Sequence, residues 1–255
     1  MSQRQDPAVI RPLNRSTADR TLVCLGFCGG GTGTYRQWAQ HMPEDTDLAL
    51  ICYPGREGRF ADDFPESWES MAADAASLVL RAADRPYVLF GHSMGGWMAF
   101  DVATRIERDH GPLPELLIVS SCNAPDRGVT ERDRFPHIED TDDELVQWML
   151  STGGALPDYA ITDPDLHEIA IELMRADVRV RDSFVPTPGL RTRLPVQVLY
   201  GADDTVIAPD VALRWKSVAA GDLHIDRLPG GHFYTPEVWQ ALPKRFRSVT
   251  SAILA

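Results

Sequence analysis

Short apolar runs recur along the chain and alternate with segments that carry apolar residues at helical spacing. Most of these runs are continuous rather than alternating, as expected for parallel strands that are covered on both faces. The last run alternates more and is expected nearer an edge of the sheet. The six predicted strands are Thr21–Phe27, Leu48–Tyr53, Tyr87–Gly91, Leu116–Ser121, Val196–Gly201 and Leu223–Leu228.

Helical segments lie between these strands, and Ser67 is the expected N-cap of the first of them. Strand–helix alternation of this kind predicts an α/β fold with a mostly parallel central sheet flanked by helices. The four predicted helices are Ser67–Ala83, Trp97–Arg108, Pro209–Ala219 and Pro236–Leu254.

One segment, residues 123–194, interrupts the alternation because it contains no strand signal. It contains two helical patterns instead, one expected to be capped by Thr141 and the other to open near Pro164. The segment is too long for a plain loop. We therefore predict a single domain over residues 1–255, with a helical lid inserted at about residues 124–194.

The stretch GHSMG (Gly91–Gly95) fits the pattern G-x-S-x-G and lies between a predicted strand and a predicted helix. The flanking glycines relieve crowding at a strained turn that exposes the serine hydroxyl. The following helix directs its N-terminal N–H groups and its dipole at the same place. An ordinary strand–turn–helix junction is the alternative, and the context favours Ser93 as a nucleophile.

A nucleophilic serine needs a base, and the base needs an orienting acid. In this type of fold the chain order is serine, acid, histidine. Asp203 and Asp204 follow the predicted strand that ends at Gly201, and we prefer Asp204 because it stands three residues past that glycine. His232 follows the last predicted strand on a glycine-rich loop and is the expected base. The other late histidine, His224, falls inside a strand pattern.

An oxyanion hole needs two backbone donors. One is expected to be the N–H of Met94, directly after the nucleophile. The other should come from the glycine-rich loop after the first predicted strand, with Gly29 preferred and Gly30 as the alternative. The same loop, GFCGGGTG, could suggest a dinucleotide site, but its spacing fits neither the Rossmann nor the Walker pattern.

Composition narrows the class of partners. With 25 Lys and Arg against 37 Asp and Glu, the formal net charge is −12, so the surface should attract neither nucleic acid nor an anionic membrane over long range. The sequence shows no signal-peptide core and no apolar run long enough for a membrane span. Its four cysteines lack CxxC or metal-site spacing. We expect a cytoplasmic protein without a metal or redox cofactor, and nothing in the sequence requires more than a monomer.

Together these motifs resemble the α/β-hydrolase fold and, more narrowly, the type II thioesterases that accompany modular polyketide synthases and nonribosomal peptide synthetases. The resemblance runs the whole length of the chain and rests on YPGRE, LFGHSMGG, DDELVQWMLSTGG, LMRADVRVRDSF, GADD and LPGGHFY. It implies a thioester hydrolase with Ser93 as nucleophile, His232 as base and Asp204 as orienting acid. The implied substrate is an acyl group on the phosphopantetheine arm of an acyl or peptidyl carrier protein in antibiotic biosynthesis, and the enzyme itself would need no cofactor.

One loop departs from the family pattern, which usually reads phenylalanine-proline-histidine-alanine-glycine-glycine. Here Cys28 stands in place of the histidine and Gly29 in place of the alanine. The departure affects the acyl or pantetheine contact that the histidine side chain would make, and Cys28 is the candidate for a substrate contact at this position. Cys28 itself lacks the elbow and an assigned base, so it is not expected to be the nucleophile.

Basic and aromatic residues supply the candidate substrate contacts. The carrier is expected to be acidic around its modified serine, so its attraction to this acidic chain must be local. Arg179 and Arg181 in the lid and Arg56 after the second strand are candidates for contacting the carrier or the pantetheine phosphate, with solvated surface charge as the alternative. Trp148 is a candidate for lining the acyl channel, with core packing as the alternative.

Two other functions fit the same scaffold. A small-molecule serine esterase or lipase would use the same triad, and preference for an oxygen ester over a carrier thioester would favour it. A binding protein on a hydrolase scaffold would be expected to lack a member of the triad, and all three members are present in the sequence.

Overall fold

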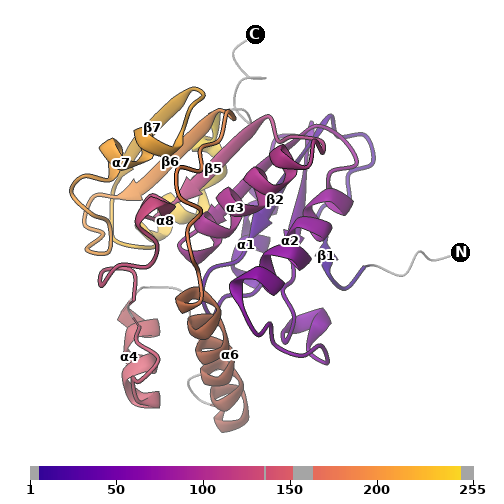
Figure 1. Cartoon of the computed structure of the whole chain (residues 1–255). Coiled ribbons are helices and arrows are strands. Elements are labelled where there is room, and N and C mark those ends of the chain that lie inside the picture. The colour runs from indigo at the N-terminus through magenta and orange to yellow at the C-terminus, as the bar shows by residue number, and fades with distance from the viewer. Residues whose placement is uncertain (1–5, 135, 152–162, 248–255) are drawn as a thin grey trace, which may run out of the picture.

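A seven-stranded sheet forms the centre of the computed structural model, which describes residues 6–134, 136–151 and 163–247 (Figure 1). The strand order is β1-β3-β2-β4-β5-β6-β7, and every neighbouring pair is parallel except β1 with β3. The strands are β1 (Val9–Ile10), β2 (Arg20–Leu25), β3 (Thr46–Ile51), β4 (Tyr87–His92), β5 (Leu116–Ser120), β6 (Val196–Gly201) and β7 (Leu223–Leu228).

The six predicted strands are confirmed to within two residues at each end, and β7 lies at an edge as expected. The prediction missed β1, because a strand of two residues is too short to produce a periodic pattern. The parallel arrangement brings the carboxyl ends of β2, β4, β6 and β7 to one edge of the sheet, where the predicted site residues follow them.

Helices cover both faces of the sheet. Three of them pack on one face, where Phe100 of α3 meets Trp215 of α7 edge to face; Figure 1 shows α2 and α3 in front of the sheet. These three are α2 (Trp68–Ala82), α3 (Met94–Arg108) and α7 (Val211–Val218). The opposite face is covered by α1 (Gly33–Arg36), α8 (Pro236–Gln240) and the 3-10 turns Gln37–His41 and Leu242–Arg245. Further 3-10 turns are Glu57–Arg59 and Pro125–Arg127.

The prediction of one continuous helix over Pro236–Leu254 is wrong in its first part. Helix α8 ends at Gln240 and a 3-10 turn follows, because Pro243 has no N–H to donate to the carbonyl of Trp239. That carbonyl instead accepts a 2.8 Å hydrogen bond from the indole N–H of Trp38. Residues 248–255 of the predicted helix lie outside the described residues.

The two predicted lid helices are present as α4 (Asp142–Ser151) and α6 (Pro164–Asp182). They lie side by side beyond the carboxyl ends of the strands, at the bottom of Figure 1. Thr141 caps α4 in a capping box with Glu144, and α6 opens at Pro164 behind an Asp163 cap, as predicted. Residues 152–162 of the predicted lid lie outside the described residues. Of the helices that the structure describes, none combines the length and apolar character needed to cross a membrane.

Candidate active site

Ser93 stands on a strained turn between β4 and α3. Its φ of 55° is unusual for a residue other than glycine, and its N–H donates to the carbonyl of Ser120 at 2.8 Å. A Cβ on Gly91 would lie 1.8 Å from the Gly95 carbonyl oxygen, and one on Gly95 would lie 2.4 Å from that of Gly26. The two flanking glycines are therefore required by close backbone approach, which fixes the direction of the serine hydroxyl.

Ser93, His232 and Asp204 form one hydrogen-bonded chain. His232 Nε2 lies 2.9 Å from Ser93 Oγ, and His232 Nδ1 lies 2.9 Å from Asp204 Oδ2. An ionised carboxylate can only accept, so the proton belongs on Nδ1, and Nε2 is left to accept from the serine hydroxyl. The side chains of His232 and Asp204 are 8% and 1% exposed, which keeps water from competing for these bonds.

The structure distinguishes between the candidate acids and bases. Asp204 is buried, and its second carboxylate oxygen accepts from the N–H of Val206 at 3.0 Å, whereas Asp203 is exposed. His224 pairs with Asp226 on β7 at 3.0 Å and is not part of the chain of hydrogen bonds to Ser93.

A second buried chain of polar groups lies directly behind the first. His92 Nδ1 is 2.9 Å from Ser120 Oγ, which is 2.7 Å from the hydroxyl of Tyr234. The His92 ring lies 5.2 Å from the His232 ring. Burial, with a smaller effect from His232, lowers the pKa of His92 well below its usual value, so His92 packs there as a neutral ring. Sequence reasoning gave no role to Ser120 or Tyr234, and it used Tyr234 only as the last residue of the LPGGHFY motif.

One of the two expected oxyanion donors has a free N–H group, and the N–H group of the other is already hydrogen-bonded. Met94 is the first residue of α3, and its N–H has no acceptor in the described part of the chain. The Gly29 N–H donates to Asp177 Oδ2 at 2.8 Å, so the expectation that Gly29 offers this group to an oxyanion is wrong for this arrangement. Gly30, the alternative, donates to the carbonyl of Phe27 at 2.9 Å. Of Cys28, Gly29 and Gly30, only Cys28 has a backbone N–H without an acceptor among the described residues.

Arg56 is not a surface residue, contrary to its interpretation as a carrier contact. It is 4% exposed and makes a bidentate ion pair with Asp177 of α6, at 2.6 and 2.9 Å. Its guanidinium also donates to the carbonyl of Gly30 at 2.7 Å. We call the set Arg56, Asp177 and Gly29 the lid latch, because it ties a lid helix to the loop beside the nucleophile. Sequence reasoning used the RAD of α6 only as a family motif and missed the role of its aspartate.

A small cavity of about 40 Å³ opens beside Ser93. Cys28, Trp148 and Arg181 line it, so three of the five proposed substrate contacts reach the site. Burial, reinforced by Asp177, raises the pKa of the Cys28 thiol, which keeps it protonated and unsuited to act as a nucleophile. The other described lining residues are Met94, Trp97, Ser121, Cys122, Asp133, Val206 and His232.

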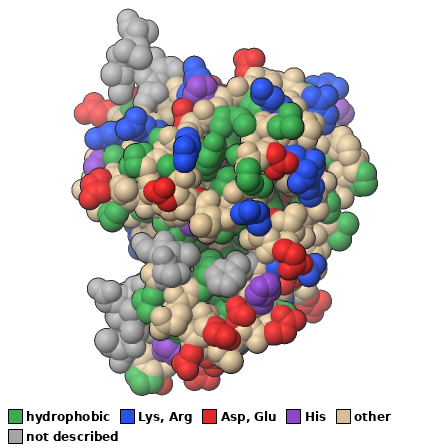
Figure 2. All heavy atoms as spheres, turned by 90° about the vertical axis from the view of Figure 1, so that its left-hand side faces the viewer, with side chains coloured by type: hydrophobic (Ala, Val, Ile, Leu, Met, Phe, Trp, Pro, Cys, Tyr) green, Lys and Arg blue, Asp and Glu red, His purple; other side chains and the backbone are tan. Residues whose placement is uncertain are grey.

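The lid arginines differ in their surroundings. Arg181 is 4% exposed, donates to the carbonyl of Pro136 at 2.8 Å and pairs with Asp182, so it does not offer a surface charge to a macromolecule. Arg179 is exposed. The lid also carries many acidic side chains, and Figure 2 shows acidic side chains gathered on the lower part of the molecule. They belong to the first turns of α4 and α6 and include Asp142, Asp143, Glu144, Asp163 and Asp165.

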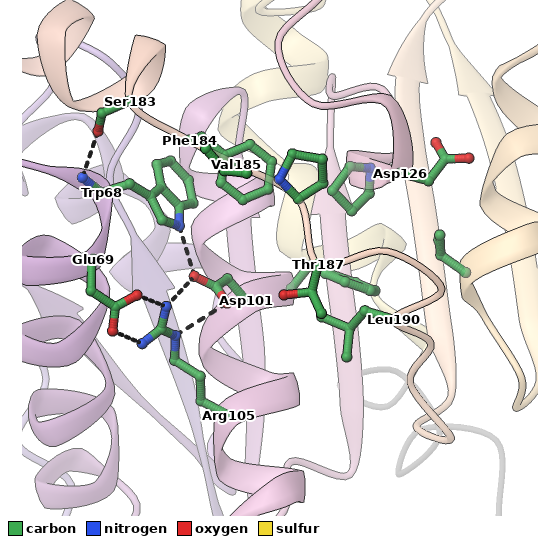
Figure 3. Close-up of a pocket in the computed structure, with 14 residues that line it drawn as sticks. Trp68, Glu69, Asp101, Arg105, Asp126, Ser183, Phe184, Val185, Thr187 and Leu190 are labelled. Carbon is green, nitrogen blue, oxygen red and sulfur yellow. Dashed lines mark hydrogen bonds and ion pairs between the residues drawn. The ribbon is translucent and has the colours of Figure 1, made fainter.

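A larger cavity of about 270 Å³ lies between α2, α3 and the segment that follows α6 (Figure 3). None of the triad residues lines it. Within residues 6–134, 136–151 and 163–247, no three His, Cys, Asp or Glu side chains gather in a way that could hold a metal ion.

Known proteins are similar to this chain in sequence and in fold. Residues 20–249 match the model of the thioesterase domain family. The chain is 32% identical over 83% of its length to AMB antimetabolite synthetase AmbE of Pseudomonas aeruginosa, of which it spans only 10%. It is 27% identical over 84% of its length to the medium-chain S-acyl fatty acid synthase thioesterase of Rattus norvegicus, covering 80% of that protein.

The fold is similar to that of a solved structure, the type II thioesterase BorB from the borrelidin biosynthetic cluster. The two share 29% identity with a TM-score of 0.80, over 94% of this chain and 96% of BorB.

Proposed function

The chain belongs to the thioesterase domain family and is a thioester hydrolase, and on that premise we propose that it is a type II thioesterase acting on carrier proteins. It would release acyl groups from the phosphopantetheine arm of an acyl or peptidyl carrier protein in polyketide or nonribosomal peptide biosynthesis. The observation that carries the proposal is the hydrogen-bonded chain of Ser93, His232 and Asp204 beside a small buried cavity. Similarity to BorB over nearly its whole length supports the choice of pathway.

The first half of the reaction forms an acyl-enzyme. Ser93 Oγ attacks the thioester carbon while His232 Nε2 takes the hydroxyl proton, and Asp204 stabilises the resulting imidazolium. The N–H of Met94 and, in place of Gly29, the N–H of Cys28 stabilise the oxyanion. When the carbon–sulfur bond breaks, His232 returns the proton to the sulfur, and the pantetheine thiol leaves.

The second half clears the acyl group. A water molecule gives a proton to His232 Nε2 and attacks the ester carbon. The bond to Ser93 Oγ breaks, the serine recovers the proton, and the free carboxylic acid departs. Every proton in the cycle passes through one imidazole nitrogen, which explains why His232 is fixed from its other side by Asp204.

Carrier recognition is assigned to the exposed lid surface. Arg179 is the one exposed residue among the three arginines that were candidates for this contact, since Arg56 and Arg181 are buried in ion pairs. The acidic first turns of α4 and α6 would repel an acidic carrier elsewhere on the lid, so a single local contact is expected to orient the partner rather than supply most of the affinity.

Hydrolysis of one short acyl group presented in three forms tests the proposal. The forms are a phosphopantetheinylated carrier protein, coenzyme A and a nitrophenyl ester, each assayed with the parent and with Ser93→Ala. We expect turnover of the carrier thioester by the parent and its loss in the variant. Equal activity in both would contradict Ser93 catalysis.

A small-molecule serine esterase is the second candidate, because the same triad cleaves oxygen esters. Cleavage of the nitrophenyl ester alone would favour it and would overturn the carrier assignment while leaving the triad in place.

A further inference from the structure

Two cavities of very different size meet at one pair of aromatic rings. Trp97 lines the cavity of about 40 Å³ beside Ser93, and Phe184 lines the cavity of about 270 Å³ in Figure 3. The two rings are stacked, with centroids 5.4 Å apart and planes inclined by 26°. The stack therefore stands between the nucleophile and a much larger space.

The larger cavity has a lining suited to an alkyl chain. Its polar groups are largely paired with one another. The Trp68 indole donates to Asp101 at 2.7 Å, and Arg105 makes a bidentate pair with Glu69, as Figure 3 shows. One carboxylate oxygen of Asp126 has no hydrogen-bond partner among the described residues. The other oxygen forms an ion pair with Arg214, which is not among the residues that line this cavity. The apolar lining consists of Trp68, Phe100, Pro125, Phe184, Val185, Pro186, Leu190 and Val218.

Both rings of the stack are held in place. Trp97 is 3% exposed, and its indole N–H donates to the carbonyl of Asn123 at 2.7 Å. Phe184 also packs against Trp68, with centroids 4.5 Å apart. Because each ring has a second contact besides the stack, we expect both rings to keep their positions rather than to swing aside.

We propose that the Trp97–Phe184 stack closes the acyl pocket and sets the longest acyl chain that the enzyme accepts. The inference rests on the proposed function, because it places the acyl group in the cavity beside Ser93. Chain length is then decided by the stack, and the space behind it is an extension that the parent enzyme does not use. One methylene group in an apolar pocket changes kcat/KM by roughly 10- to 200-fold, so removing the wall should alter the preference strongly.

The test compares kcat/KM for acetyl, butyryl, hexanoyl, octanoyl and decanoyl coenzyme A. The parent is compared with Trp97→Ala and Phe184→Ala. We expect the ratio of octanoyl to acetyl turnover to rise at least about tenfold in each variant. Leu190→Ala is the matched control, because it enlarges only the rear cavity and should leave the parent profile unchanged. Adding Leu190→Trp to Trp97→Ala refills that cavity and should restore the parent ratio.

The outcomes separate the two proposals. An active parent whose octanoyl-to-acetyl ratio is unchanged in both variants overturns the wall and leaves the thioesterase assignment standing. If the parent hydrolyses none of these coenzyme A thioesters, and no acyl thioester on a carrier protein, the proposed function is overturned. If Trp97→Ala fails to fold, Phe184→Ala decides the question, since Phe184 is partly exposed and its truncation leaves the Trp97–Asn123 bond in place.

Discussion

The two halves of the candidate active site are held in place by different forces. The triad half stands on loops at the carboxyl ends of β4, β6 and β7. Its serine is fixed by backbone approaches so close that Gly91 and Gly95 cannot carry a side chain. The lid half stands on α4 and α6, and a buried ion pair between Arg56 and Asp177 ties it to the sheet.

This difference determines how each half responds to change. Backbone packing is nearly insensitive to the chemistry of any one side chain, so the triad can lose a functional group and keep its shape. A buried ion pair behaves in the opposite way, because removing one partner leaves the other charge uncompensated. Catalysis and lid placement should therefore be separable by mutation.

The largest expected effect is in the triad half, where a substitution should abolish catalysis without lowering the stability of the fold. Ser93→Ala should lower kcat on a short acyl thioester by about 10⁴- to 10⁶-fold, because no other described group can take the place of the nucleophile. The midpoint of thermal unfolding should stay within about 2 °C of the parent, measured by calorimetry. Ser217→Ala, the same change at an exposed position on α7, is the control and should alter neither quantity. A large fall in thermal stability with Ser93→Ala would contradict the separation of the two halves.

The lid latch should show the reverse behaviour. Asp177→Ala leaves Arg56 buried without its partner and should lower the free energy of unfolding by about 3–5 kcal/mol, measured by urea denaturation. It also frees the Gly29 N–H and removes the tie between α6 and the loop that carries Cys28. We therefore expect kcat to fall as well.

Replacing both residues of the ion pair separates the effect of an unpaired buried charge from any role of the pair in positioning the loop beside Ser93. Arg56→Met with Asp177→Leu removes both charges and should recover most of the lost stability. If kcat stays low in this double variant, the latch positions the loop beside Ser93. Recovery of both stability and kcat would mean that the ion pair has no positioning role.

The same contrast explains which residues the sequence could predict. Ser93, Asp204 and His232 could be selected from the sequence because each follows a predicted strand within a short local pattern, and the structure brings the three together. The error at Gly29 has a different origin, since its hydrogen-bond partner Asp177 lies 148 residues away and no local pattern records that contact. Arg56 was predicted to contact the carrier, with solvated surface charge as the alternative, because its partner Asp177 is likewise distant, at 121 residues.

The error at the last predicted helix has a local cause, since a proline inside a helical pattern ends or kinks the helix. The periodic pattern of the last predicted helix continues past Pro243, but the structure interrupts the helix there and directs the Trp239 carbonyl to Trp38. The indole N–H of Trp38, which donates to this carbonyl, belongs to a residue 201 positions away in the sequence. For the Gly29 N–H and for the Trp239 carbonyl alike, the hydrogen-bond partner is distant in the sequence, and no local pattern predicts it.

A smaller effect concerns pH and the neutral His92 behind the triad. Its pKa in the folded protein lies well below the ordinary value near 6.5, so the unfolded chain binds a proton that the folded one does not. The stability that His92 contributes is therefore present above about pH 6.5 and falls by up to about 1.4 kcal/mol for each pH unit below it. Urea denaturation between pH 7.5 and 5.5 should show a steeper loss for the parent than for His92→Phe. Parallel curves would contradict a depressed pKa at His92.

The smallest expected effect tests whether the exposed part of the lid meets the carrier. Arg179→Glu should raise KM for a carrier-bound acyl group about two- to fivefold, as expected for an exposed charge contact worth up to about 1 kcal/mol, and added salt should reduce the difference. Turnover of the same acyl group on coenzyme A should not change, because Arg179 lies outside the cavity beside Ser93. Arg108→Glu makes the same charge change at the far end of α3 and serves as the control. An equal rise in KM for both variants would mean that only net charge matters, and that the lid half of the site contributes to the proposed reaction through its buried contacts alone.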